Sequence, residues 1–143
     1  MKLLLQRVKN AELRVDGAVV SQIGKGMCVF CGVEKDCDEN TLGKLASKLA
    51  LIRIFEDENG KTNKSVLDIG GEILLISQFT LLADCSRGTR PDFLNAEKPD
   101  RAKELYLKFG ELLEKANVPV KYGVFGADMQ ITQLNDGPFS III

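Results

Sequence analysis

The sequence contains no histidine, and this absence narrows the chemistry that the protein can perform. Imidazole is the side chain that enzymes use most often as a general base, and it is also a common metal ligand. A Ser-His or Cys-His nucleophile pair is therefore excluded. A reactive site in this chain has to work largely with main-chain groups or with other side chains.

Strong net charge and long apolar runs are also missing. The formal net charge is -1 and the sequence pI is about 5.6, so no overall positive field attracts nucleic acid, and any RNA contact must use a local patch. No apolar stretch approaches bilayer length, and polar residues interrupt the first segment too early for a signal peptide. We expect a cytoplasmic protein with no membrane partner.

The four cysteines do not form a complete redox or zinc pattern. Cys28 and Cys31 lie in an apolar segment flanked by glycines, so on a strand their side chains would point to opposite faces. Cys37 and Cys85 stand alone, and no histidine completes a ligand set. We expect buried or incidental thiols, no metal site and no cofactor.

The 143 residues, of which 45% are hydrophobic, fit one domain over residues 1–143 with its own core. Alternation places Leu3, Leu5 and Arg7 on one face of a first strand. Arg7 then either extends its guanidinium to solvent at a sheet edge or holds backbone carbonyls in a site. Residues 11–15 and 18–20, joined by an Asp-Gly pair, have the form of a hairpin.

Two helices and several further strands complete the expected fold. Apolar residues at helical spacing predict helices over about residues 38–50 and 102–116. We expect a strand at 27–33, a central strand at 72–76, and three closing strands at 118–125, 128–134 and 139–143. The acidic run at 56–61 is interpreted as a solvated turn rather than a calcium loop. The predicted fold class is α+β: a single compact domain with mainly antiparallel or mixed sheet layers and two principal helices.

Residues 77–80, Ser-Gln-Phe-Thr, are the first candidate site because they end the central strand. At such an end the last N–H groups leave the ladder and become free to donate to a bound oxygen. If the extension persists, Gln78 and Thr80 share a face. Three interpretations stay open: a Ser or Thr nucleophile, for which no base is evident, polar residues that merely cap the strand, and a main-chain clamp for an oxyanion or ligand.

Residues 135–138, Asn-Asp-Gly-Pro, are the second candidate. An ordinary turn before the last strand is one interpretation. The other is a cis bond between Gly137 and Pro138, because the cis form is far more accessible before proline than elsewhere. Two successive carbonyl oxygens would then point the same way, and glycine would let the backbone approach a ligand closely.

Several separated motifs, in order along essentially the whole chain, resemble the D-aminoacyl-tRNA deacylases of the bacterial and eukaryotic type. They are residues 5–8 (Leu-Gln-Arg-Val), 53–55 (Arg-Ile-Phe), 77–81 (Ser-Gln-Phe-Thr-Leu), 90–91 (Arg-Pro), 125–130 (Phe-Gly-Ala-Asp-Met-Gln) and 135–138. Two departures are visible. Phe139-Ser140 replaces the usual Val-Thr, which would alter packing, and Cys85-Ser86 stands where basic residues are common, which would weaken a tRNA contact.

The resemblance implies a homodimer that hydrolyses the ester joining a D-amino acid, or glycine, to the terminal adenosine of tRNA, including glycyl-tRNA mischarged on tRNA-Ala. It implies that a cis Gly137-Pro138 pair reaches into the partner's site, is held by Arg7, and rejects L side chains. The other implied site residues are Ser77, Gln78 and Thr80 beside the substrate, the N–H groups of Phe79 and Thr80 at the oxyanion, and Phe125 and Met129 at the adenosine. The implied role is chiral proofreading in the quality control of translation.

An aminoacyl ester is already activated, and the neighbouring ribose 2′-hydroxyl can assist its hydrolysis. Positioning and charge stabilisation are then sufficient, so the missing histidine is expected. A covalent Thr80 nucleophile is the less favoured alternative, because no base is placed beside it.

Without the resemblance, the residues fit either a hydrolase or a small-ligand binding module. A DNA- or chromatin-associated structural protein would need a broad basic face and would bind with a steep salt dependence. The basic residues between positions 87 and 103 form only a modest cluster: Arg87, Arg90, Lys98, Arg101 and Lys103. Such a cluster suits the acceptor end of a tRNA better, and we expect no DNA partner.

Overall fold

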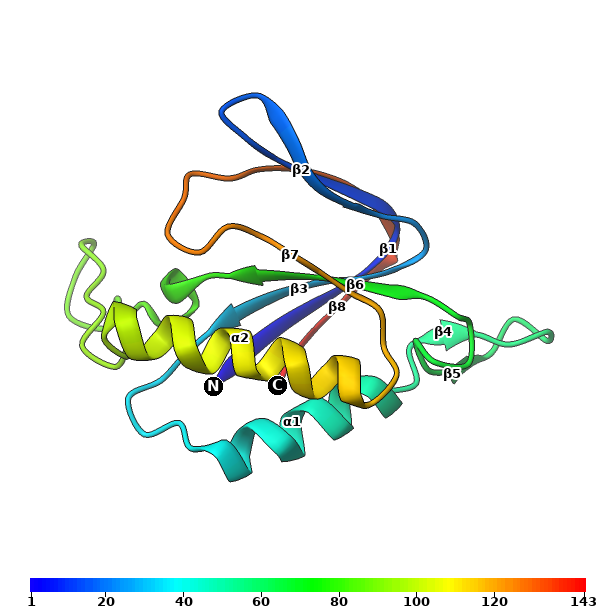
Figure 1. Ribbon diagram of the computed structural model, residues 1–143, viewed down its shortest axis with the longest axis horizontal. Coiled ribbons are helices and arrows are strands. Elements are labelled where there is room, and N and C mark those ends of the chain that lie inside the picture. The colour runs from blue at the N-terminus through cyan, green and yellow to red at the C-terminus, as the bar shows by residue number, and fades with distance from the viewer.

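The computed structural model describes residues 1–143 as a mixed sheet with two helices packed on one side (Figure 1). The elements in chain order are β1 (Lys2–Val15), β2 (Ala18–Ile23), β3 (Gly26–Gly32), α1 (Glu39–Leu51), β4 (Phe55–Glu56), β5 (Thr62–Lys64), β6 (Glu72–Ser77), the 3-10 turn η1 (Phe79–Leu82), α2 (Pro99–Lys115), β7 (Val120–Tyr122) and β8 (Gln130–Ile142). The main sheet runs β2-β1-β3-β6-β7, and β8 pairs with β1. The β3–β6 and β6–β7 pairs are parallel and the others antiparallel, which confirms the predicted α+β class.

The long strand β1 organises the sheet because it is paired along both edges. Its first half pairs with β3, its second half pairs with β2, and β8 runs antiparallel along the opposite edge. The hairpin from β1 to β2 forms as predicted: Asp16 and Gly17 both have positive φ, at 50° and 80°, as a two-residue turn between twisted strands requires. This double pairing of β1 curves the sheet towards a barrel.

The core lies on both faces of the central strands β3 and β6. Cys31 packs with the apolar side chains beneath the helices, whereas Cys28 packs in a second cluster on the opposite face. The two thiols therefore point away from each other, as alternation predicts. Burial raises the pKa of each to about 12, so both stay protonated and unreactive at neutral pH. Cys37 is also buried, and Cys85 is exposed.

Both predicted helices are present. The Asp38 carboxylate caps α1 by accepting the Thr41 N–H at 2.7 Å. Helix α2 starts with Pro99 and buries one stripe of its surface against the sheet. In that stripe the Tyr106 hydroxyl donates to the Leu75 carbonyl at 2.7 Å, which joins α2 directly to the central strand β6. Neither helix is long and apolar enough to cross a bilayer.

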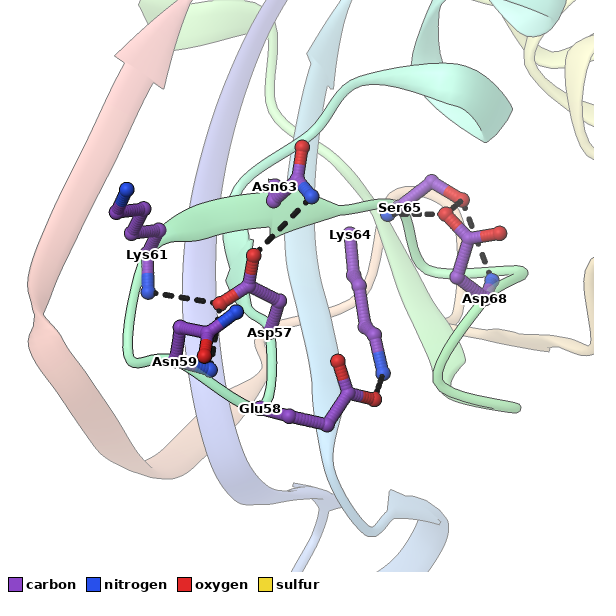
Figure 2. A network of polar contacts seen from close by, with 8 residues as sticks. All are labelled: Asp57, Glu58, Asn59, Lys61, Asn63, Lys64, Ser65 and Asp68. Atoms are coloured by element: carbon purple, nitrogen blue, oxygen red, sulfur yellow. Dashed lines mark hydrogen bonds and ion pairs between the residues drawn. The ribbon is translucent and has the colours of Figure 1, made fainter.

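The acidic run forms an exposed turn, as predicted, between the short strands β4 and β5 (Figure 2). The Asp57 carboxylate accepts N–H groups of Asn59 and Lys61 at 2.9 and 3.0 Å, and the Asn63 amide at 3.1 Å. These hydrogen bonds lower the pKa of Asp57, and the one from the Lys61 N–H has the largest effect. Both oxygens of this carboxylate are therefore used to fold the turn itself.

One condition set for the strands is not met, and one expectation about them is wrong. The chain does not stay extended at residues 78–80, because it enters η1 at Phe79 and Gln78 is the residue before that turn. The three closing strands are in fact two. Strand β7 covers only Val120–Tyr122, and residues 130–142 form the single strand β8, which pairs with β1 on both sides of residues 136–139.

Candidate active site

A cavity of about 520 Å³ lies at the carboxyl end of β6. The end of β6 and the start of η1 form one wall, the first turns of α2 and the residues before it form a second, and the loop leading to β8 forms a third. Figure 1 shows these three segments meeting at the end of β6, the strand arrow in green. Five of the expected site residues line the cavity: Ser77, Gln78, Phe79, Phe125 and Met129.

The sequence places main-chain donors at this point because a buried strand turns abruptly. Ile76 is fully buried, and the Gln78 N–H makes the last ladder bond, to the Cys31 carbonyl at 2.8 Å. Phe79 and Thr80 then occupy the first positions of η1. The first N–H groups of a helical turn have no acceptor within it. They are therefore free to donate to an oxygen of a bound molecule, as the sequence predicts.

The side chains of this turn point in different directions. Gln78 donates its amide N–H to Thr80 Oγ1. Thr80 is exposed and does not line the cavity, so its side chain contacts that of Gln78 but lies outside the cavity that Ser77 and Gln78 line. Phe79 lines the cavity and is 57% exposed, so it stands at the rim.

The ionisable groups of the cavity are poorly suited to nucleophilic attack. Burial raises the pKa of the Cys31 thiol to about 12. Burial also raises the pKa of Tyr106, whose hydroxyl is engaged with β6. Glu97 accepts the Lys98 N–H at 2.7 Å and lies 3.4 Å from the Arg101 guanidinium. Asp128 is the other carboxylate of the lining and is exposed.

Sequence reasoning missed the contribution of α2 and the segment before it. Ala96, Glu97, Pro99, Ala102 and Tyr106 all line the cavity. Nothing local in the sequence connects residues 96–106 with the end of β6. The one available signal was a tyrosine within the apolar stripe of the second helix, since a buried hydroxyl needs an acceptor and here finds it on β6.

Arg7 forms a second group with β8. Val8 pairs with Asn135 and Gln6 pairs with Ser140. Between these pairs β1 has one residue, Arg7, whereas β8 has four, residues 136–139, so β8 forms a bulge opposite Arg7. Arg7 is only 6% exposed, and its guanidinium donates to the Asp136 carbonyl at 2.9 Å and to the Ile54 carbonyl at 2.6 Å. It also lies 4.9 Å from the centre of the Phe139 ring. The guanidinium of Arg7 therefore binds backbone carbonyls and does not extend to solvent at a sheet edge.

Gly137 and Pro138 are the exposed tip of this bulge. The peptide bond between them is cis, and the Gly137 φ is 132°, in the region that favours glycine. Neither residue lines the cavity of its own chain, and neither does Arg7. The structure therefore brings the expected residues together in two separate groups, one around the cavity and one around the bulge.

The chain matches the family model described as D-Tyr-tRNA(Tyr) deacylase over residues 4–143. It belongs to the D-aminoacyl-tRNA deacylase family. A relative of that name from Persephonella marina is 52% identical over 140 residues, which cover 98% of this chain and 95% of the relative. Another, from Rhodopirellula baltica, is 48% identical and covers 100% of this chain and 99% of its own. The chain is thus a hydrolase that acts on the ester bond of D-aminoacyl-tRNA, and the resemblance seen in its motifs is confirmed.

Two solved structures support the fold of this deacylase. One, named c-Myc DNA Unwinding Element Binding Protein, superposes with a TM-score of 0.94 at 41% identity and covers 100% of this chain and 97% of its own. The other is described as a probable eukaryotic D-amino acid tRNA deacylase, with a TM-score of 0.85, 17% identity, and coverage of 99% and 97%. At that identity the second match speaks only for the fold.

Proposed function

We propose that the cavity at the end of β6 holds the aminoacylated terminal adenosine of tRNA, and that the N–H groups of Phe79 and Thr80 stabilise the oxyanion formed when water attacks the ester. One observation carries this proposal. The buried strand turns at Gln78 into η1, and this leaves the first N–H groups of the turn without acceptors: that of Phe79, which lines the cavity, and that of Thr80, the next residue. Fixed main-chain donors at such a place lower the energy of developing negative charge.

The ribose 2′-hydroxyl of the substrate supplies the remaining assistance in this proposal. The chain has no histidine, its cavity thiol is held protonated, and Glu97 is already engaged with Arg101. Water adds to the ester carbonyl, the adenosine oxygen leaves as a hydroxyl, and free amino acid and tRNA are released. Covalent catalysis by Thr80 is the less favoured route, because no base contacts its hydroxyl, which instead accepts a hydrogen bond from Gln78.

The cavity walls suggest how the substrate lies. Ser77 and Gln78 border the amino acid beside the oxyanion donors, and Phe125 and Met129 face the adenosine from the loop before β8. An aromatic ring and a thioether suit the flat apolar face of a base. The donors and the adenosine contacts then come from different segments of one chain.

Selection by handedness is assigned to Gly137 and Pro138 of a second copy. They are exposed, Arg7 fixes the bulge that carries them, and they are absent from the cavity of their own chain. Placed over the partner's cavity, their carbonyls would collide with an L side chain and leave room for a D side chain or for none. Glycyl-tRNA mischarged on tRNA-Ala would then also be a substrate, and the active form would be a homodimer.

On this proposal the protein binds the acceptor end of aminoacyl-tRNA in the cytoplasm and proofreads chirality in translation. The test is to incubate the purified protein with matched D-, L- and glycyl-tRNA and to follow loss of the ester. Rapid loss of the D and glycyl esters with survival of the L ester is expected. Retention of all three without turnover would instead indicate a binding module, and equal loss of D and L would remove the chiral filter.

The homodimer is tested separately by light scattering. A mass of twice the 15.7 kDa chain is expected, because Gly137 and Pro138 do not line the cavity of their own chain and the proposal needs them at a cavity. A second indication is the exposed apolar side chains on β8, where Leu134 is 53% and Ile142 is 66% exposed. A monomer with full stereoselectivity would contradict the assignment to a second copy.

DNA binding is a second candidate only because a 41% identical solved structure is named for it. The net charge of -1 argues against a broad electrostatic contact. Competition decides between them: unlabelled duplex DNA should leave deacylation of D-aminoacyl-tRNA unchanged at physiological salt.

A further inference from the structure

An aromatic pair, of which one ring is exposed and the other half-buried, adjoins the rim of the cavity. The rings of Phe79 and Phe93 meet edge to face, with centroids 4.8 Å apart and planes at 60°. Phe79 lines the cavity and is 57% exposed, whereas Phe93 is half-buried and does not line it. Phe79 begins η1 and Phe93 lies in the segment between η1 and α2, so the pair joins the cavity to that segment, whose course Figure 1 shows.

The segment that carries Phe93 is held in place by its own hydrogen bonds. Asp84 and Asp92 exchange two backbone hydrogen bonds, of 2.9 and 3.0 Å. The Ala96 N–H donates to the Phe93 carbonyl at 3.0 Å, and the Lys35 N–H donates to the Asn95 carbonyl at 3.2 Å. Phe93 thus lies in a loop, residues 84–95, that is closed between Asp84 and Asp92 and is anchored at Asn95 to the segment after β3.

The same loop carries free positive charge. Arg87 and Arg90 are exposed, and neither forms an ion pair. The carboxylates of Asp84 and Asp92 are partly occupied, since they accept the N–H groups of Ser86 at 2.8 Å and of Leu94 at 3.2 Å. Aromatic rings and unpaired guanidinium groups in one loop are a combination that binds single-stranded nucleic acid, because bases stack on rings and phosphates pair with arginine.

We propose that the Phe79–Phe93 pair stacks with the base of the nucleotide immediately before the terminal adenosine, and that Arg87 and Arg90 lie beside the adjoining phosphates. This inference rests on the proposed function, in which the terminal adenosine fills the cavity. The next nucleotide then has to leave over the rim, and the exposed ring of Phe79 is at that rim. Phe93 becomes a substrate-binding residue that acts outside the reacting centre.

The test compares two substrates that differ only beyond the terminal adenosine. One is D-aminoacyl-tRNA and the other is the same D-amino acid esterified to adenosine alone. For Phe93→Leu we expect kcat/KM on the tRNA to fall about tenfold, as expected for loss of one base–ring stack, with no change on aminoacyl-adenosine. Phe93→Tyr keeps the ring and should retain activity on both. Leu94→Ala removes an exposed apolar side chain from the same loop and serves as the control.

A binding measurement that needs no turnover gives an independent answer. A trinucleotide matching the tRNA 3′ end, with 2-aminopurine in the penultimate position, should lose fluorescence on binding the wild-type protein, because stacking quenches that base. Phe93→Leu should bind it with less quenching. If the bound wild-type complex shows no quenching, the proposal is overturned even where the variant fails to fold.

The kinetic outcomes separate this inference from the proposed function. An equal fall on both substrates, or no fall on either, overturns the stacking role of Phe93 while leaving the deacylase site intact; the second of these results would also fit an aromatic pair that docks another protein. Wild-type protein inactive on both D esters would overturn the proposed function and this inference together.

Discussion

Replacing Arg7 with lysine tests whether a buried guanidinium holds the β8 bulge. Arg7 is 6% exposed and donates to two carbonyls from distant segments, those of Ile54 and Asp136. The two carbonyls accept from different nitrogens, Nε and Nη1, and the single ammonium nitrogen of lysine cannot occupy both positions, so we expect one of the two hydrogen bonds to be lost. Loss of one charge-assisted hydrogen bond in a buried place should lower the free energy of unfolding by about 1.5–3 kcal/mol.

A matched control lies on the same strand. Arg14 also contacts a carboxylate and a carbonyl, those of Glu12 at 2.7 Å and Gly17 at 3.0 Å. Its side chain is 44% exposed, so water can replace the lost contacts. Arg14→Lys should therefore change the free energy of unfolding by less than about 0.5 kcal/mol.

Urea unfolding followed by circular dichroism measures both variants. Protein concentrations must be equal, because unfolding of a dimer depends on concentration. The m-value should stay constant while the midpoint of Arg7→Lys falls. If the two variants lose the same stability, or if Arg7→Lys loses less than about 0.5 kcal/mol, burial of the guanidinium does not stabilise the bulge as argued.

Three further predictions concern glycine, thiols and pH. Gly137→Ala should lower the free energy of unfolding in urea by about 1–3 kcal/mol, because the Gly137 φ is 132° and the added Cβ would lie 3.0 Å from a main-chain nitrogen. The control Gly43→Ala lies in a helix with open space around it and should raise the free energy of unfolding by about 0.5–1 kcal/mol. Equal effects of the two substitutions would contradict this argument. Ellman's reagent should titrate one thiol rapidly in the native protein, that of Cys85, and four after denaturation, so a rapid native reaction in Cys85→Ser would show that a buried thiol is accessible. Hydrogen bonds, of which the one from the Lys61 N–H has the largest effect, lower the pKa of Asp57 in the folded protein. The ionised Asp57 carboxylate therefore stabilises the fold above about pH 4, and this stabilisation is lost below it. Since no histidine titrates, the urea midpoint should stay nearly constant from about pH 5 to 7, and a steep change in that range would count against the argument.

Local features of the sequence were sufficient for most of the elements. The Asp-Gly turn and the helical spacing of apolar residues each act over a few residues, and each has the predicted form in the structure. The opposite orientation of Cys28 and Cys31 follows from the two-residue period of a strand. The candidate segments at 77–80 and 135–138 were also found from the sequence and its family resemblance.

Features that depend on distant partners were not predictable in this way. Residues 128–134 and 139–143 look like two strands because Gly and Pro separate them, yet both pair with β1 and form one strand around a bulge. The end of β6 turns into η1 instead of continuing. The cavity wall from α2 depends on how a helix docks on the sheet, through contacts such as that of Tyr106 with Leu75.

The sequence by itself determined the chemistry that is available: no imidazole, buried thiols, a polar segment after an apolar strand, and a Gly-Pro pair near the end. These follow from residue type and short-range periodicity. Only the tertiary structure decided that Arg7 faces the bulge, that Thr80 stays outside the cavity, and that Gly137 and Pro138 are absent from the cavity of their own chain. Those facts depend on pairings between segments more than a hundred residues apart, as between Arg7 and Asp136, and no local pattern encodes them.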